Sequence, residues 1–472
     1  MSFASSSYLP LAEKACQFLS KSTDPYHAVH QSVLKLQAAG FTELVPNKFT
    51  SHGIKPGGQY YYTIHQSTLV AFSVGRKYTP TNSAFQLIGG HTDSPNLRIK
   101  PISKRTPSSG CTQLGVQCYG GGLWHTWFDR DLSVSGKVLV RNNNNKEIHH
   151  CLVQLQDPIA RISTLCIHLQ SAEERKAFCV NKEDHTIPII ATTTSTKLGE
   201  TNPQLEQAAE EQVNVKKPKL NNNNDDDDTD PWLDQQEPLL LHRIAEALQI
   251  ETNQIADLDL SFYDTQPSAI GGINREFLYS GRLDNLATVF CAITALIDYN
   301  ANKKEDDNDT DIQMVVCFDH EEVGSTSLNG AGSPVMEQAV RRISAALNGG
   351  DTNPELYANA IAKSFCLSID QAHAVHPNYA SKHEKQHAPV LNGGLVIKRN
   401  ANQRYATNSE TGFLVRELGR KAKIPIQEFV VRNDCPCGST IGPTISALTG
   451  IRTVDAGMPQ LSMHRYESSL RR

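Results

Sequence analysis

Short apolar runs alternate with segments of helical spacing along most of the chain. Apolar residues recur three and four positions apart over residues 8–20 and 25–39, which predicts two helices. Uncharged runs rich in β-branched residues, typical of buried strands, then lie at 68–74, 85–88, 312–317 and 365–369. Strands that alternate with helices predict an α/β fold whose mostly parallel sheet is flanked by helices.

The pattern changes between about residues 97 and 188, where short β-like runs are separated by glycine and asparagine. This spacing predicts a β-rich insertion. Residues 192–230 are of low complexity and include four asparagines at 221–224 and four aspartates at 225–228, so we expect a flexible loop there. The domains expected are a catalytic domain in two parts, 1–96 and 249–472, and an inserted domain at 97–248.

Carboxylates and imidazoles stand where the predicted strands end. His91 follows the run at 85–88, behind two glycines that would let the backbone turn sharply. Other candidates at or near strand ends or in the loops beyond them are Asp284, Glu321, Glu322, Asp370 and His464. Ligands of open α/β sheets bind beyond the carboxyl ends of the strands, so these side chains are expected to meet. Taken singly, each has a structural alternative: a helix cap for Asp284, a hydrogen-bonded loop for His91 and Asp93, and a solvated strand end for the glutamates.

The combination of residue types points to metal chemistry. Imidazole and carboxylate ligands suit zinc and manganese, and three carboxylates with two histidines can hold two ions if one carboxylate bridges them. Two ions about 3.5–4 Å apart can lower the pKa of a shared water and stabilise the oxyanion of a hydrolytic intermediate. Glu321, next to a ligand, is then free to act as a general base, so the sequence predicts a hydrolase.

Composition narrows the classes of partner. A formal net charge of −5 argues against nucleic acid, which normally requires a basic face. No run of about 18 apolar residues occurs, and the N-terminus lacks a signal-peptide core, so we expect neither a membrane span nor secretion. The chain has eleven cysteines, and Cys166, Cys317 and Cys366 lie in apolar runs, which favours reduced core thiols and a cytoplasmic protein.

Five motifs occur in an order that resembles the aspartyl aminopeptidase family of co-catalytic zinc peptidases. They are Gly-His-Thr-Asp-Ser-Pro at 90–95, Gly-Arg-Leu-Asp-Asn at 281–285, Asp-His-Glu-Glu-Val-Gly-Ser at 319–325, Asp-Gln-Ala-His-Ala-Val-His-Pro-Asn-Tyr at 370–379 and Ser-Met-His at 462–464. The resemblance implies two divalent ions, zinc above all, with manganese or cobalt as alternatives at one site. It implies the ligands His91, Asp284 as the bridge, Glu322, Asp370 and His464.

The same resemblance assigns roles to further residues. Asp93 would orient His91, and Glu321 would activate a metal-bound water and deliver its proton to the leaving amine. Such enzymes release N-terminal Asp or Glu from peptides, and the cation that recognises the acid would be Lys398, with Tyr405 and His373 as further substrate contacts.

The inserted segment resembles the family's dimerisation domain, and related enzymes assemble from dimers into dodecamers. By that resemblance His168 would reach the active site of a neighbouring subunit. The residues alone place His168 in an apolar strand, where the ordinary interpretation is a core histidine. A closed assembly would restrict substrates to peptides.

Two departures from the family leave alternatives open. His125 stands where the family typically has serine, and the chain ends eight residues after His464, without the usual C-terminal helix. A neutral aminopeptidase or an acyl-amino-acid deacylase on the same scaffold is one alternative. A catalytically inactive assembly or cargo protein is the other.

Overall fold

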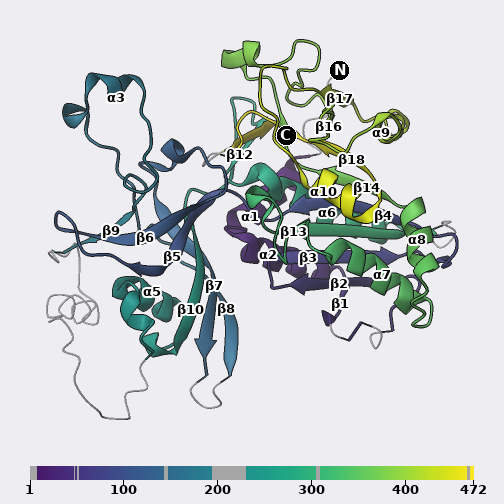
Figure 1. Ribbon diagram of the computed structural model, residues 1–472, viewed down its shortest axis with the longest axis horizontal. Coiled ribbons are helices and arrows are strands. Elements are labelled where there is room, and N and C mark those ends of the chain that lie inside the picture. Colours follow the sequence, from purple (N-terminus) through teal and green to yellow (C-terminus); the bar gives the residue numbers. More distant parts are fainter. Residues whose placement is uncertain are drawn as a thin grey trace. The chain divides into compact units, whose positions relative to one another are not determined.

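The structure is a computed structural model that describes residues 8–46, 48–49, 53–142, 147–193, 230–304, 309–464 and 468–471. The chain divides into two compact units, one formed by Met1–Ser94 with Pro267–Arg472 and the other by Pro95–Gln266. Most of the predicted loop at 192–230 lies outside the described residues. Each unit has its own sheet and its own apolar core (Figure 1).

The first unit is built on a nine-stranded sheet. Its strands lie in the order β1 (Thr42–Glu43), β2 (Gln59–Ile64), β3 (Thr68–Val74), β13 (Ile312–Phe318), β4 (Phe85–His91), β14 (Phe365–Ile369), β18 (Arg452–Gly457), β16 (Leu395–Lys398) and β17 (Ile426–Phe429). The four central strands β13, β4, β14 and β18 are parallel, so their carboxyl ends meet at one edge. The predicted α/β fold is therefore confirmed.

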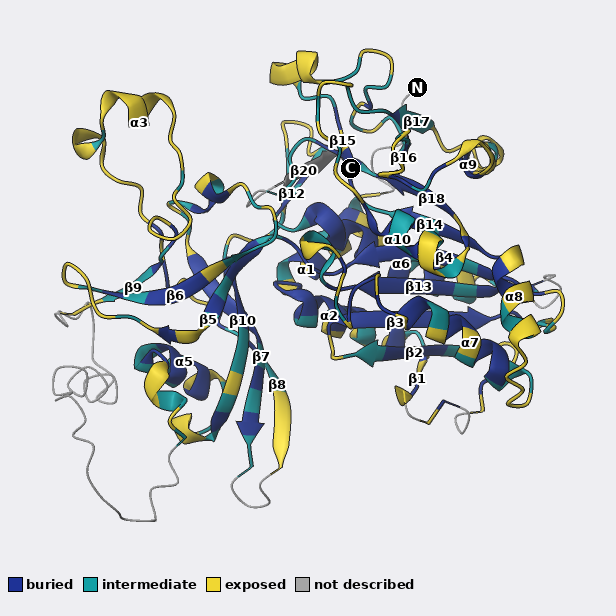
Figure 2. Ribbon diagram, in the orientation of Figure 1, coloured by how far each residue is buried: buried dark blue, intermediate teal, exposed yellow. Residues whose placement is uncertain are grey.

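Helices cover both faces of this sheet. Helices α1 (Leu9–Lys21), α2 (Pro25–Ala38) and α6 (Leu283–Ala301) share one apolar cluster with the sheet, and α7 (Val335–Leu347), α8 (Pro354–Lys363) and α10 (Ile441–Thr449) share another. Strand β13 has no charged residue because both of its faces are buried. Val315 and Cys317 face the first cluster, and Met314 and Val316 face the second. Figure 2 shows this strand buried along its length. Helix α9 (Ser409–Ala422) packs beside β16 and β18.

A smaller sheet lies beside the ends of these strands within the same unit. Its order is β11 (Ala269–Gly271), β12 (Phe277–Ser280), β20 (Ser468–Arg471), β19 (Pro459–Gln460) and β15 (Ala372–His373). The last strand, β20, pairs with both β12 and β19. His464 therefore lies on a segment held at both ends by strand pairing.

The second unit is β-rich. Its six-stranded sheet has the order β8 (Ile148–Gln154), β7 (Leu132–Arg141), β10 (Ile255–Asp264), β5 (Asn96–Lys104), β6 (Cys111–Tyr119) and β9 (Ile189–Thr192). All the neighbouring strands are antiparallel. Helix α5 (Pro238–Leu248) and the buried rings of Trp124 and Trp127 complete its core.

The segment that carries His168 differs from the strand that its apolar residues indicated. It forms a short 3-10 helix, η3 (Ile167–Leu169), followed by helix α3 (Ala172–Lys176). Ile167 is 61% exposed and Leu169 is 71% exposed, and Cys166 is exposed as well. The interpretation of His168 as a core histidine is wrong, because in the described structure this apolar run has no partner strand to bury it. Figure 2 shows the exposed loop around α3.

Within the described residues, no helix is long and apolar enough to cross a membrane.

Candidate metal centre

The two glycines before His91 serve a different purpose from the expected turn. Strand β4 continues through both and includes His91, and neither glycine has a positive φ. A Cβ added at Gly89 would lie 3.2 Å from Ile441, and one at Gly90 would lie 3.0 Å from Thr288. The glycines therefore let helices α10 and α6 approach the strand closely. This close packing brings the start of α6, where Asp284 lies, up to His91.

His91 is surrounded by carboxylates at the end of β4. Its Nε2 atom lies 3.3 Å from Asp284 Oδ1, 3.5 Å from Asp370 Oδ1 and 3.9 Å from Glu321 Oε2. The other ring nitrogen, Nδ1, lies 3.0 Å from the backbone oxygen of Asp93. A histidine ligand usually donates its second N–H to such an acceptor, which fixes the ring and its tautomer.

A second histidine approaches the same group from the C-terminal segment. His464 Nε2 lies 3.5 Å from Asp284 Oδ2 and 3.3 Å from Glu322 Oε2. The two oxygens of Asp284 thus face two different imidazoles. This is the arrangement that a bridging carboxylate requires. The structure brings together all five residues that the sequence singled out as ligands.

Asp93 connects the two halves of the cluster. Its side chain is fully buried, and its two oxygens accept hydrogen bonds from the backbone N–H groups of Glu321 and Glu322, each at 3.1 Å. Oδ1 also lies 3.4 Å from His91 Nδ1. One carboxylate therefore holds the turn η6 (Glu321–Val323) against the end of β4.

The electrostatics of the cluster show an excess of buried negative charge. Burial, and then the carboxylate of Asp284, raises the pKa of Glu322 well above its ordinary value. Burial together with Asp370 and Asp284 raises the pKa of Glu321 to about 8. Burial alone would raise the pKa of Asp284 too, but His464 and His91 beside its oxygens hold that pKa well below the usual range.

The donor set fits divalent zinc. Within the described part of the chain, Asp284 Oδ1 and Glu322 Oε1 are buried and accept no hydrogen bond. Oxygen and imidazole atoms of His91, Asp284 and Glu322 all lie within 4.8 Å of one another. Buried carboxylate oxygens without donors are costly, and a cation is the partner that would offset both the missing hydrogen bonds and the crowded charge.

Lys398 lies beside the carboxylate oxygen of Asp370 that does not approach His91. Its ammonium is 3.4 Å from Asp370 Oδ2 and 5.5 Å from the centre of the Tyr405 ring, and the residue is only 4% exposed. A buried lysine of this kind needs a carboxylate partner, and Asp370 provides one. His373 lies on the short strand β15, and burial together with Lys398 lowers the pKa of His373 to about 4, so the imidazole is neutral near pH 7.

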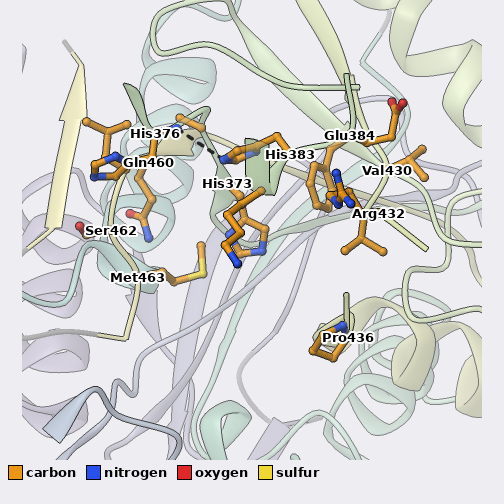
Figure 3. Close-up of a pocket in the computed structure, with 15 residues that line it drawn as sticks. His373, His376, His383, Glu384, Val430, Arg432, Pro436, Gln460, Ser462 and Met463 are labelled. Carbon is orange, nitrogen blue, oxygen red and sulfur yellow. Dashed lines mark hydrogen bonds between the residues drawn. The ribbon is translucent and has the colours of Figure 1, made fainter. Parts of the chain in front are cut away.

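A pocket of about 280 Å³ opens next to this group. Figure 3 shows His373 near the middle of the pocket lining, Met463, which directly precedes His464, on one side, and Glu384 and Arg432 on the other. The dashed line marks the hydrogen bond from the backbone N–H of His376 to His383 Nε2 at 3.4 Å. Lys398 does not line this pocket.

Two residues that support the candidate ligands lie within the quoted motifs, but the sequence analysis gave them no role. Gln371 donates from Nε2 to Asn285 Oδ1 and to Thr288 Oγ1, each at 3.1 Å, and Asn285 donates to the backbone oxygen of Ile369 at 2.8 Å. These bonds join the segments that carry Asp284 and Asp370. The signals that could have found them are their places in these motifs, each directly after a predicted ligand. His168 belongs to the other unit, in the exposed segment described above.

Several known proteins are similar to this chain in sequence and in fold. The sequence profile of a family described as "Aminopeptidase I zinc metalloprotease (M18)" matches residues 18–470. "Aspartyl aminopeptidase 4" of Saccharomyces cerevisiae is 44% identical over 453 residues, which cover 95% of this chain and 88% of that protein. "Aspartyl aminopeptidase" of Aspergillus oryzae is 42% identical over 459 residues, covering 95% of this chain and 89% of that protein.

Solved structures agree. One in "Cryo-EM structure of the Ape4 and Nbr1 complex" has a TM-score of 0.85 and 38% identity, and covers 98% of this chain and 82% of its own. One in "Structure of S. cerevesiae mApe1 dodecamer" has a TM-score of 0.81 and 28% identity, and covers 98% of this chain and 93% of its own. The resemblance to aspartyl aminopeptidases is confirmed. The chain belongs to the M18 family of zinc metalloproteases and is a metalloaminopeptidase.

Proposed function

We propose that this aminopeptidase releases N-terminal Asp or Glu from peptides and uses two zinc ions. The observation that carries the proposal is Lys398, a buried lysine whose ammonium lies 3.4 Å from Asp370, a candidate ligand. An ammonium held this close to the reacting centre is placed to attract a carboxylate on the first residue of the substrate. Tyr405 and His373 would complete the side-chain pocket, since Tyr405 lies beside Lys398 and His373 is neutral.

The two-ion assignment follows from how the carboxylates divide between the histidines. His91 and Asp370 would hold one ion, His464 and Glu322 the other, and Asp284 would bridge them with one oxygen on each side. When bound, two such ions supply Lewis acidity that lowers the pKa of a water molecule and stabilises negative charge on the substrate carbonyl. Manganese or cobalt at one site remains an alternative.

Glu321 is the proposed general base. It lies 3.9 Å from His91 Nε2, beside the candidate ligands, and burial among carboxylates raises the pKa of Glu321, so its carboxylate would hold a transferred proton more firmly than an exposed glutamate does. Glu321 would take a proton from the attacking water and deliver it to the leaving amine. Asp93 would fix the backbone of Glu321 and Glu322 through the two hydrogen bonds, so that their side chains point in different directions.

A homo-oligomer, a dodecamer built from dimers, is the proposed assembly. The support is an mApe1 relative solved as a dodecamer, together with the exposed apolar side chains of Leu165, Ile167 and Leu169 around His168. Apolar side chains gathered on an exposed segment are typical of a protein interface. His168 would reach the active site of a neighbouring subunit from this segment.

The proposed location is the cytoplasm. All eleven cysteines are free thiols, and Cys317 and Cys366 are buried in the core. Free thiols in this number favour a reducing compartment. The location of the tagged protein in intact cells tests this proposal.

The test combines zinc content with substrate preference. The purified chain is expected to contain two zinc ions and to hydrolyse aspartyl and glutamyl anilides faster than leucyl anilide. Lys398→Leu should abolish that preference, while Lys421→Leu, on the exposed last turn of α9, should leave it unchanged. Equal rates on leucyl and aspartyl anilides in the unaltered chain would favour a neutral aminopeptidase. Zinc without any turnover would favour an inactive assembly protein.

A further inference from the structure

The pocket shown in Figure 3 contains a side chain whose hydrogen-bonding groups are unused. Gln460, on strand β19, is 2% exposed and lines the pocket beside Ser462 and Met463. Within the described residues, neither its Nε2 nor its Oε1 forms a hydrogen bond. A buried amide without partners is costly, so its retention needs an explanation beyond the fold.

Two of the charged side chains that line the pocket are already paired with a residue of opposite charge or a histidine. The guanidinium of Arg432 donates to both carboxylate oxygens of Asp434, at 2.8 and 2.7 Å. One carboxylate oxygen of Glu384 lies 2.6 Å from Nδ1 of His387. His373 is neutral near pH 7. Lys382 is exposed at the rim, where solvent screens its charge. A pocket with a free amide and paired charges suits a neutral polar group, and a peptide unit is one, since it offers both a donor and an acceptor.

The position of the pocket indicates which peptide unit it can bind. Met463 directly precedes His464, and His373 follows Asp370 by three residues, so the pocket borders the candidate metal centre. Lys398, the proposed contact for the side chain of the first substrate residue, is absent from its lining. A second cavity of about 350 Å³ shares His383, Glu384 and Arg432 with this pocket and is otherwise lined by Lys385, Asn433 and Asp434. Since none of the candidate ligands lines the second cavity, the two cavities together offer room for the part of a peptide beyond the scissile bond.

We propose that Gln460 is a substrate-binding residue whose side-chain amide holds the peptide unit that follows the scissile bond. The inference rests on the proposed function. The amide would either accept from the N–H or donate to the C=O of that unit, since the two groups of a trans peptide point in opposite directions, and it would do so whatever the side chains of the substrate. Met463 lies beside Gln460, and the flexible, unbranched side chain of methionine allows the small shift that exposes the amide to the substrate.

The substrates that test this differ only beyond the scissile bond. Aspartyl anilide has no peptide unit after the bond that is cut, whereas Asp-Ala-Ala has one. Gln460→Met keeps the length and volume of the side chain and removes its donor and acceptor. It should lower kcat/KM for Asp-Ala-Ala about tenfold, the value of one good hydrogen bond, and change kcat/KM for the anilide less than about twofold. Zinc content should stay unchanged.

A matched control is Gln427→Met. Gln427 is also a strand glutamine, but its amide bonds Val390 and Gly394 and lies outside the pocket lining. This variant should treat both substrates as the unaltered chain does. An equal loss on both substrates with Gln460→Met, or no loss on either, would overturn the proposal.

A measurement on the unaltered chain keeps the proposal testable if Gln460→Met does not fold. Asp-Ala-Ala should be cleaved with a kcat/KM about tenfold above that of Asp-Ala, which has no complete peptide unit after the scissile bond. Equal values would refute the role of Gln460. Failure of the proposed function would look different, since the unaltered chain would then hydrolyse leucyl anilide as fast as aspartyl anilide or would hydrolyse no aspartyl substrate at all.

Discussion

Asp93→Asn is the most informative single change at the metal centre. The aspartate accepts one backbone N–H on each carboxylate oxygen, from Glu321 and from Glu322. Asparagine has the same shape but only one oxygen. Its NH₂ group would therefore face one of the two N–H donors, and one of the two bonds would be lost.

The magnitude follows from the two hydrogen bonds. A bond to a charged acceptor contributes roughly 1.5–3 kcal/mol, a neutral one roughly 0.5–1.5 kcal/mol, and a buried N–H left without an acceptor costs roughly 1–3 kcal/mol. The variant should thus lose about 2–4 kcal/mol of local stability. Residues that support metal ligands typically change metal affinity about 10–100-fold, and we expect zinc affinity to fall by that factor.

Competition with a zinc-binding dye measures the affinity, and hydrolysis at saturating zinc measures what activity remains. Asp311→Asn is the matched control, because Asp311 also accepts N–H groups on both oxygens, from Ala84 and from Gln86, but lies before the start of β13, away from the centre. The control should lower thermal stability and keep zinc affinity. An Asp93→Asn chain with unaltered zinc affinity would refute the positioning role.

Further changes probe the base, the ions, the neighbouring subunit and the last strand. Glu321→Gln should keep both zinc ions and slow hydrolysis by about 10²–10⁴, measured on aspartyl anilide. Chelation should lower the free energy of unfolding by about 4 kcal/mol relative to protein with zinc at a thousand times its Kd, measured by calorimetry. His168→Ala should lose activity with its zinc retained, and mixed assembly with Glu321→Gln chains should restore some of that activity if His168 acts across subunits. Deleting 468–472 removes β20 and should reduce zinc from two ions to one, measured by mass spectrometry, because His464 loses one of its two anchors.

The central sheet was predictable because its strands are buried on both faces. Burial of both faces favours a run without charged residues that is mostly apolar, and β13 and β14 have such runs. The segment around His168 carries a similar apolar signal without a sheet to receive it. Local composition alone cannot distinguish a buried strand from an exposed apolar loop, since the difference depends on whether neighbouring strands pair with the segment.

The candidate ligands were predictable for a topological reason, and the substrate contacts were not. Parallel strands deliver their carboxyl ends to one edge, so polar residues at those ends are expected to meet. Lys398 instead lies at the end of β16, and nothing in the four residues of that strand indicates that its ammonium is buried against Asp370. Gln460 belongs to a strand of two residues, which has no periodicity to interpret.

The contrast between Glu321 and Glu322 shows where chemical roles at such a site originate. The two side chains are identical and adjacent, yet Glu322 lies 3.3 Å from His464 while Glu321 lies 3.9 Å from His91. Their directions are set by the backbone, which enters the turn through His320 at φ 62° and leaves it through Gly324 at φ 97°. Asp93 holds both N–H groups of that turn. The proposed division between a metal ligand and a proton carrier would therefore be a property of the turn, because the two side chains are chemically identical and differ only in the direction that the backbone gives them.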